Sequence, residues 1–216
     1  MSTYLLERRV EEKERRRLEI IEAAERAYME KGWDLLTMDQ VARSARLSRA
    51  LVYVYFKDKD DLLLAIAGRS IERLAERFRE AASHAERGLE KIEAMGRAYI
   101  AYSLEFPHYF DAETRFQAGR KLGEDRPCEV ACAEAVDKVH NVLVETIRLG
   151  LADGSVRADI GDPEVVSVAL WAFSHGLVQI VTAKEQALAA RGIAVAQVTE
   201  ESIRMLQYML AARPPN

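Results

Sequence analysis

Apolar residues recur at three- and four-residue spacing along almost the whole chain, and this periodicity constrains the fold more than any other feature. In residues 19–32 it places Ile20, Ala24 and Tyr28 on one stripe of a helix, which Gly32 ends. The same spacing predicts further helices over 38–45, 49–56, 59–83, 89–105, 108–120, 128–151, 163–190 and 196–212. We therefore expect an all-α fold of about nine helices.

The composition fits a soluble globular protein. Of 216 residues, 49% are apolar and 31% are charged, and this composition is too apolar for a disordered chain. The chain is also long enough to bury a sizeable core. No apolar run is expected to reach the roughly 20 residues that span a bilayer, and the N-terminus lacks the apolar centre of a signal peptide. Two cysteines are too few for a disulfide framework, so we expect a cytoplasmic protein.

The stretch LSRALVYVYFKDKDDLL, residues 47–63, needs a specific explanation. Its centre has the composition of a β-strand, but Ser48 stands before it like a helix cap. On a helix Val52 and Phe56 fall one turn apart and face a core, while Ala50 and Val54 lie on the opposite side. A helix this short is unstable alone, so packing must hold it.

The outer face of this short helix suits the major groove of DNA. Small apolar side chains meet thymine methyl groups, Arg49 can reach guanine, and tyrosine hydroxyls can donate to phosphates. Residues 41–57 contain Arg43, Arg46, Arg49 and Lys57 and no acid, although the whole chain has a net charge of −4. Two short helices joined by a tight turn form a helix-turn-helix.

Residues 20–64 resemble the DNA-binding domain of TetR-type transcriptional repressors. The resemblance is carried by AAERAYMEKGW, by T-x-x-x-V-A at 37–42, by L-S-R at 47–49 and by Y-x-Y-F-K-x-K-D-x-L at 53–62. It implies that Thr37, Tyr53, Tyr55 and Lys59 hold phosphates and that residues 49–51 and 54 lie nearest the bases. Together with the basic window, the expected DNA contacts are Thr37, Arg46, Ser48, Arg49, Ala50, Leu51, Tyr53, Val54, Tyr55, Lys57 and Lys59.

Three positions depart from the family pattern. Ala50 and Leu51 stand where the family often has Gly then Thr, and Val54 replaces a more common polar or aromatic residue. Leucine cannot donate a hydrogen bond, so base readout should depend on methyl contacts and on Arg49.

The remainder of the chain is expected to bind a ligand and to dimerise. We place the DNA-binding domain at residues 1–64 and a ligand-binding and dimerisation domain at 65–216. The sequence ALWAFSHGLVQI, residues 169–180, is similar to the Trp-x-x-x-His-Gly pattern of TetR-type regulatory domains. This similarity implies that the helices at 163–190 and 196–212 pair with their mates in a homodimer.

An aromatic cluster in FPHYFDAETRF, residues 106–116, suggests where an effector binds. An apolar cavity with a few polar groups is typical of small-molecule sites. The alternative is that these side chains are plain core, and His175 can either fix a ligand or satisfy a backbone carbonyl. The candidate lining residues are Met95, Phe106, Tyr109, Phe110, Phe116, Trp171 and His175.

Two further segments allow more than one interpretation. Cys128 and Cys132 share a helix face, which permits a thiol sensor or a soft-metal site with His140, but ordinary packing is favoured because metal sites need three or four ligands. Residues 7–17 are nearly all charged and extend the first helix. They are either a basic arm that touches DNA or a solvated face of Glu–Arg pairs, and the alternation of acids and bases favours the second.

The resemblance, together with the basic window, implies a ligand-responsive transcriptional repressor. Its partners would be a pseudo-palindromic double-stranded DNA operator and a small, largely apolar effector, and it would have no membrane partner. We expect no enzyme activity, no cofactor and no metal, because no Gly-rich phosphate loop, HExxH or GxSxG is present. The alternative function is a dimeric helical module that binds a small molecule or a protein and never engages DNA.

Overall fold

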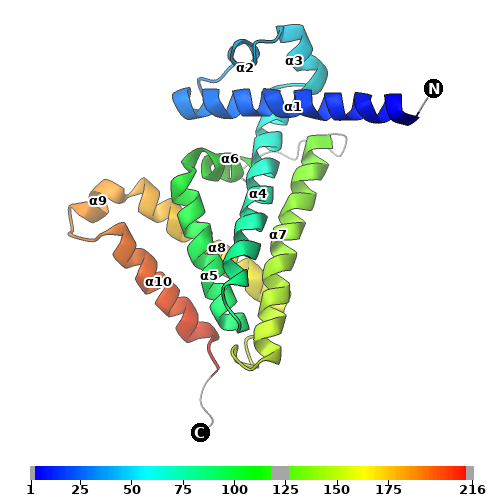
Figure 1. Cartoon of the computed structure of the whole chain (residues 1–216). Coiled ribbons are helices and arrows are strands. Elements are labelled where there is room, and N and C mark those ends of the chain that lie inside the picture. Colours follow the sequence, from blue (N-terminus) through cyan, green and yellow to red (C-terminus); the bar gives the residue numbers. More distant parts are fainter. Residues whose placement is uncertain (1–2, 118–126, 213–216) are drawn as a thin grey trace. The chain divides into compact units, whose positions relative to one another are not determined.

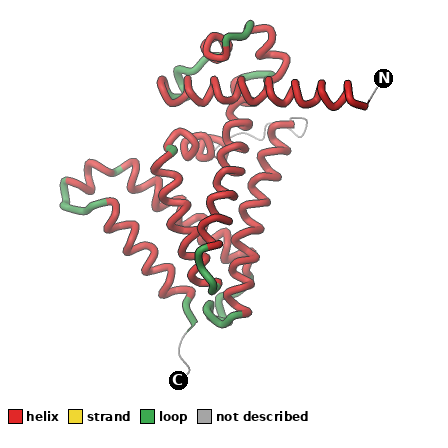
Figure 2. Tube along the Cα trace, viewed as in Figure 1, coloured by secondary structure: helices red, strands yellow, loops and turns green. Residues whose placement is uncertain are grey.

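The structure is a computed structural model that describes residues 3–117 and 127–212. Within these ranges it contains only helices, joined by loops, and no strand (Figures 1 and 2). The all-α prediction is confirmed. The helices are α1 (Thr3–Lys31), α2 (Met38–Ala45), α3 (Arg49–Tyr55), α4 (Lys59–Ser83), α5 (Gly88–Glu105), α6 (Pro107–Gln117), α7 (Pro127–Ala152), α8 (Pro163–Ala183), α9 (Glu185–Ala189) and α10 (Val195–Leu210).

The described helices number ten rather than about nine, because the segment expected at 163–190 divides into two. Lys184 leaves helical geometry, with φ −119° and ψ 14°, and separates α8 from α9. No proline or glycine marks this position, so the sequence carries no local signal for the break. The helix expected at 108–120 lies partly outside the described residues, and α1 includes the charged run at 7–17 as one continuous helix.

The chain forms two compact units. Unit 1 comprises residues 1–70 and 108–133, and unit 2 comprises residues 71–107 and 134–216. The predicted domain boundary after residue 64 lies inside α4. The division into a DNA-binding domain and a ligand-binding domain at that residue therefore stays a prediction. Sequence reasoning gave no sign that α6 and the start of α7 belong with the N-terminal helices.

The core of unit 1 forms where α1 meets the short helices that follow it. The predicted stripe on α1 is buried, with Ile20 at 0% exposure. Val41 of α2 is also fully buried, as are Val52 and Phe56 in and just after α3. Apolar burial of this kind supplies roughly 25 cal/mol per Å², which holds helices too short to be stable alone.

The core of unit 2 is built from α5, α7, α8 and α10. Its buried cluster contains Ile92, Ile147, Val156, Leu170, Leu206 and Leu210. At one end of this unit the backbones of α5 and α7 almost touch. A Cβ atom added at Gly88 would lie 2.2 Å from Cα of Gly150, so only glycine fits there.

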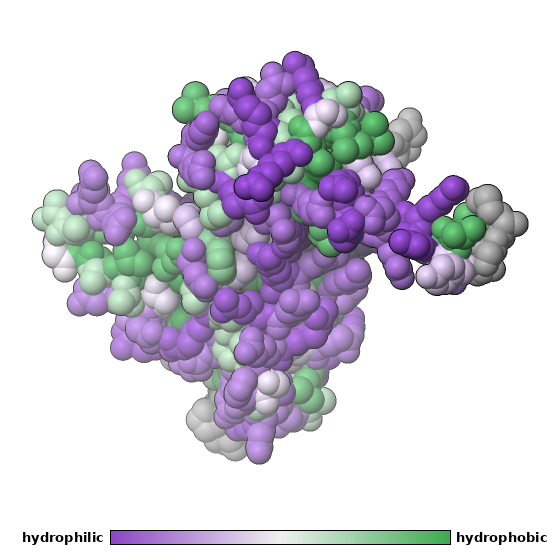
Figure 3. Space-filling model, turned by 45° about the horizontal axis from the view of Figure 1, so that its top comes forward, coloured by the Kyte–Doolittle hydropathy of each residue, from purple (hydrophilic) through white to green (hydrophobic). Residues whose placement is uncertain are grey.

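Helix α8 corrects one expectation from the sequence. By length and composition alone it is long and apolar enough to cross a membrane, although only 28% of its most apolar window is buried within the chain. Single helices of this kind also occur in soluble proteins, where a partner covers them. Figure 3 shows hydrophobic residues gathered on the surface in the region of α8, α9 and α10.

Among the described residues of unit 1, three side chains that carry a carboxyl group are buried, those of Glu25, Asp61 and Glu113. Glu113 of α6 accepts a hydrogen bond of 2.6 Å from the hydroxyl of Ser70, and its side chain is withdrawn from water. Burial raises the pKa of Glu113 to about 7, and the hydrogen bond from Ser70 lowers it by a smaller amount. The folded protein therefore keeps a proton on this carboxyl that the unfolded chain releases near pH 4.5.

This buried carboxyl predicts how stability depends on pH. Between about pH 4.5 and 7 the folded state binds more protons at Glu113 than the unfolded state, so the free energy of unfolding falls as the pH rises. Urea titrations at pH 5 and pH 8 measure this fall in the free energy of unfolding. The fall should be about 3 kcal/mol smaller in the Glu113→Gln variant than in the wild type. Identical losses in the two proteins would contradict the raised pKa.

Candidate nucleic-acid interface

The first helix of the predicted helix-turn-helix begins with a complete capping box. The Thr37 hydroxyl oxygen accepts a hydrogen bond from the backbone N–H of Gln40 at 3.3 Å. The Gln40 side-chain oxygen accepts one from the N–H of Thr37 at 2.9 Å. Thr37 is exposed, and its hydroxyl still has its own proton to donate. It can therefore cap α2 and contact an outside acceptor at once.

A tight turn connects α2 to α3. Arg46 adopts the left-handed conformation, with φ 56° and ψ 39°, and the N–H of Leu47 donates to the carbonyl of Ala42 at 2.9 Å. A residue with a side chain is strained there. The strain is tolerated because the turn closes α2 and starts α3, and it leaves the Arg46 side chain exposed.

Helix α3 presents its outer face to solvent as predicted. The Ser48 hydroxyl accepts a hydrogen bond from the N–H of Leu51 at 3.2 Å and caps the helix. Val54 is 73% exposed, although the helix that carries it is anchored in a core. Ala50 is also exposed, whereas Leu51 is only half-exposed and turns partly toward the protein.

Arg49, the predicted base reader, already has partners in the free protein. Its Nε lies 3.2 Å from Oδ1 of Asp39 in α2, and its Nη2 lies 3.5 Å from the Tyr53 hydroxyl. The hydrogen bond to Tyr53 and the charge of Asp39 raise the pKa of Arg49. Its guanidinium also lies 5.4 Å from the centre of the Tyr53 ring. The side chain is thus held across the outer face of α3.

Lys59 at the start of α4 is also engaged. Its ammonium donates a hydrogen bond to the backbone carbonyl of Trp33 and lies 4.7 Å from the centre of the indole ring. Partial burial lowers the pKa of Lys59. Lys57, two residues earlier, is exposed. The first turn of α4 is capped by its own chain, because the N–H of Asp61 donates to a carboxylate oxygen of Asp58 at 2.9 Å.

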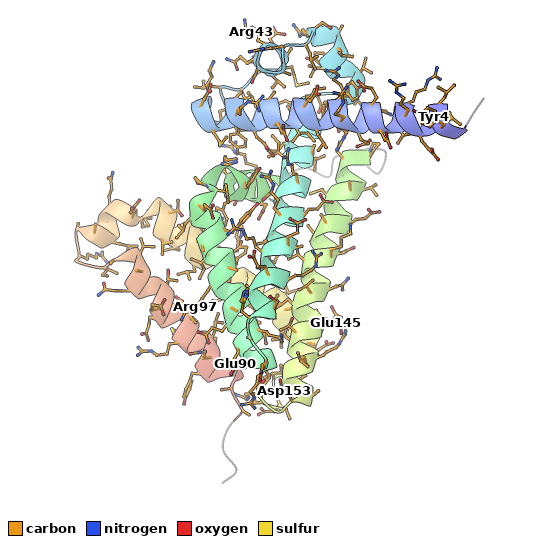
Figure 4. The ribbon with its side chains drawn as sticks, viewed as in Figure 1. Tyr4, Arg43, Glu90, Arg97, Glu145 and Asp153 are labelled. Carbon is orange, nitrogen blue, oxygen red and sulfur yellow. The ribbon has the colours of Figure 1, made fainter. Side chains whose placement is uncertain are left out.

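The structure brings the expected DNA contacts onto one region of unit 1. Thr37, Arg46, Ser48, Arg49 and Ala50 are exposed, as are Tyr53, Val54 and Lys57, while Leu51, Tyr55 and Lys59 are half-buried. Two residues of the same region were missed. Asp39 pairs with Arg49 across the turn, and Arg43 projects from α2 (Figure 4). The acid-free window at 41–57 contained the signal for Arg43, but nothing in the sequence announced the role of Asp39.

The candidate effector-binding residues are divided between the two units, so whether they line one cavity stays a prediction. In unit 2, Met95 and His175 are buried, Phe106 is half-buried and Trp171 is 43% exposed. In unit 1, Tyr109 is buried and Phe110 is half-buried, while the side chain of Phe116 lies outside what the structure describes.

His175 has a partner that sequence reasoning missed. The hydroxyl of Tyr99 in α5 lies 2.8 Å from its Nδ1, and both side chains are buried. Burial lowers the pKa of His175, so its imidazole is held neutral. The Trp171 ring lies on the same helix with its centre 5.8 Å from that of His175. Tyr99 and His175 thus form a buried, hydrogen-bonded polar pair among largely apolar side chains.

The two cysteines are free and buried in unit 1. Burial raises the pKa of the Cys132 thiol to about 12, which keeps it protonated and unreactive. His140, the proposed third metal ligand, instead lies 2.9 Å from a carboxylate oxygen of Glu164. Among the described residues no group of three His, Cys, Asp or Glu side chains is arranged to hold a metal. The packing interpretation of the cysteines agrees with this geometry.

Comparison with known proteins tests the resemblance. The family model described as "Bacterial regulatory proteins, tetR family" matches residues 20–66, and "Tetracyclin repressor-like, C-terminal domain" matches residues 92–206. The HTH-type transcriptional regulator HbdR of Aromatoleum sp. is 28% identical over 67% of this chain, and the match spans only 61% of HbdR. The HTH-type transcriptional repressor AcnR of Corynebacterium glutamicum is 28% identical over 67% of this chain and 70% of its own length.

Solved structures show the same fold. A protein of unknown function from Rhodococcus sp. RHA1 superimposes with a TM-score of 0.74 at 21% identity, over 91% of this chain and 95% of that one. Bacillus subtilis FadR in complex with stearoyl-CoA gives a TM-score of 0.69 at 16% identity, over 88% and 96%. Because the two family models cover most of the sequence, including the helix-turn-helix, the chain belongs to the TetR family of bacterial regulatory proteins.

Proposed function

We propose that the protein is a cytoplasmic transcriptional repressor that binds a pseudo-palindromic DNA operator as a homodimer and releases it when an effector binds. The observation that carries this proposal is the outer face of α3. A helix fixed to the core by Val52 leaves Ala50 and Val54 exposed, with Arg49 lying beside them. Small apolar groups flanked by a guanidinium match the thymine methyls and guanine acceptors of a major groove.

Phosphate contacts would fix the register of α3 in the groove. Thr37 at the start of α2 and Tyr53 on the flank of α3 present hydroxyl donors. Lys57 is exposed and adds a charge. The Lys59 ammonium uses one of its three N–H donors on the Trp33 carbonyl, so two donors remain for a phosphate.

The exposed apolar surface of α8 and α10 would form the dimer interface. A homodimer places two copies of this surface against each other and removes it from water. This interpretation explains why α8 has the composition of a membrane helix although most of its apolar window is not buried within the chain. The large exposed apolar residues on these helices are Val165, Val168, Trp171, Ile180, Met205, Tyr208 and Met209.

The effector would be a largely apolar small molecule recognised in unit 2. The hydroxyl of Tyr99 and the imidazole of His175 supply a polar pair there, and the Trp171 ring lies beside His175. Effector binding would change the separation of the two α3 helices in the dimer, and a change of a few ångströms would break phosphate contacts in both half-sites. Mass spectrometry of small molecules that copurify with the protein would identify the class of effector.

The groove contact of α3 is tested by adding a charge to its outer face. Val54→Glu places a carboxylate against DNA, and because Val54 is 73% exposed the substitution leaves the core intact. Fluorescence anisotropy with duplexes that the wild type selects from a random library should show at least about a tenfold decrease in affinity. The matched control is Met29→Glu on α1, where an apolar residue 57% exposed receives the same charge.

The control should bind like the wild type. Equal affinities for Val54→Glu and Met29→Glu would contradict the placement of α3 in the groove. If the wild type selected no common sequence and bound no duplex at low salt, the protein would instead be a helical module that does not engage DNA.

The dimer interface is tested by a charge on α8. Val168→Asp places a carboxylate in the proposed interface at a residue that is 48% exposed in the single chain. Sedimentation velocity should show a shift from dimer to monomer, and affinity for a two-half-site duplex should fall because the two half-sites are no longer bound by linked subunits. Leu104→Asp on α5, at a residue 44% exposed, is the control and should remain dimeric. A dimeric Val168→Asp protein would place the interface elsewhere.

A further inference from the structure

The charged run at the N-terminus forms a projecting helical arm. Helix α1 begins at Thr3, whereas its first buried residue is Ile20. The outer part of the intervening stretch, defined here as the arm (residues 4–17), is exposed as far as Arg15. At 1.5 Å per residue the arm is about 20 Å long, and in Figure 4 it is the end of α1 that carries Tyr4.

Many charges of the arm separate by sign around the helix axis. Acids and bases alternate along the sequence, which favours a face of mutual ion pairs. At 100° per residue, however, Arg9, Lys13 and Arg16 fall on one side, and Glu7, Glu11 and Glu14 fall on the opposite side. The helical geometry therefore does not support a uniformly self-paired face along the whole arm.

Ion pairing divides the arm's bases into two groups. Arg15 lies 2.6 Å from a carboxylate oxygen of Glu12, and Arg16 lies 2.7 Å from one of Glu19, so the self-paired interpretation holds for the inner part of the arm. Arg9 and Lys13, further out, make no ion pair or hydrogen bond with any residue that the structure describes. Two cations on one side of the arm thus have their full charge available to a partner.

The basic side of the arm continues the side of α1 that packs on the helix-turn-helix. Arg9 and Lys13 are four residues apart, and Ile20, buried in the core of unit 1, follows seven residues later on the same stripe. Arg17, one turn after Lys13, lies with its guanidinium 5.5 Å from the centre of the Phe56 ring, where α3 ends. The exposed Lys57 follows Phe56 directly.

We propose that the arm binds the phosphate backbone of DNA beside the segment read by α3, with Arg9 and Lys13 as the contacting residues. The inference rests on the proposed DNA-binding function and adds a second point of attachment to it. A polyanion is the partner that the observations favour, because Arg9 and Lys13 lie together on the side of α1 that leads to the end of α3, whereas the acids without a partner among the described residues, Glu7, Glu11 and Glu14, lie on the opposite side.

The arm is tested with Arg9→Ala combined with Lys13→Ala. The control is Arg79→Ala combined with Arg191→Ala, which makes the same change in net charge at exposed residues of unit 2. Affinity is measured by anisotropy between about 50 and 300 mM KCl. This range includes 0.1 M salt, at which the Debye length is about 10 Å. The probes are the selected duplex and a scrambled duplex of equal length. Circular dichroism and sedimentation verify that helix content and oligomeric state are unchanged.

The arm variant should bind both duplexes more weakly, by about tenfold or more at roughly 0.1 M salt, and its plot of log affinity against log salt should be shallower by about 0.9 for each phosphate that it no longer touches. A slope equal to that of the control variant would overturn the arm proposal while leaving the repressor proposal intact. Failure of the wild type to bind either duplex at the lowest salt concentration would instead overturn the repressor proposal itself.

Discussion

The exposed outer face of α3, which is the proposed DNA-reading surface, depends on the burial of two side chains on the other side of the helix. A helix of seven residues such as α3 does not persist in water by itself. Val52 and Phe56, both fully buried, fix it to the core of unit 1, and Ser48 caps its start. The core contacts use one side of the helix only, so the opposite side remains available for another molecule.

The sequence predicted the parts of the fold that local signals determine. The cap at Ser48 and the spacing of Val52 and Phe56 placed α3 correctly, and Gly32 marked the end of α1. The break at Lys184 carries no such signal. The assignment of α6 to unit 1 depends on contacts between distant segments, including the hydrogen bond from Ser70 to Glu113. Periodicity within one helix cannot report these contacts.

The candidate site shows the same limit. Exposed positions on α3 followed from a helical wheel, because the wheel needs only the direction of the core. The pairing of Arg49 with Asp39 and the pairing of Tyr99 with His175 join residues on different helices. The alternation of acids and bases along residues 7–17 predicted ion pairs only in part, for a related reason. Ions that alternate along the chain can lie on opposite sides once the helix is formed.

The contact between Arg49 and Asp39 has a consequence for how the protein would search a chromosome. On the proposed interpretation, Arg49 must leave a carboxylate of its own chain before it can reach a base. At most sites along DNA it would find no matching pair of acceptors, and it would remain folded onto Asp39. A correctly placed guanine offers two acceptors for bidentate hydrogen bonds, which would compensate for the broken ion pair. The guanidinium on the reading face would then add little to the retention time at wrong sites, which favours rapid sliding between them.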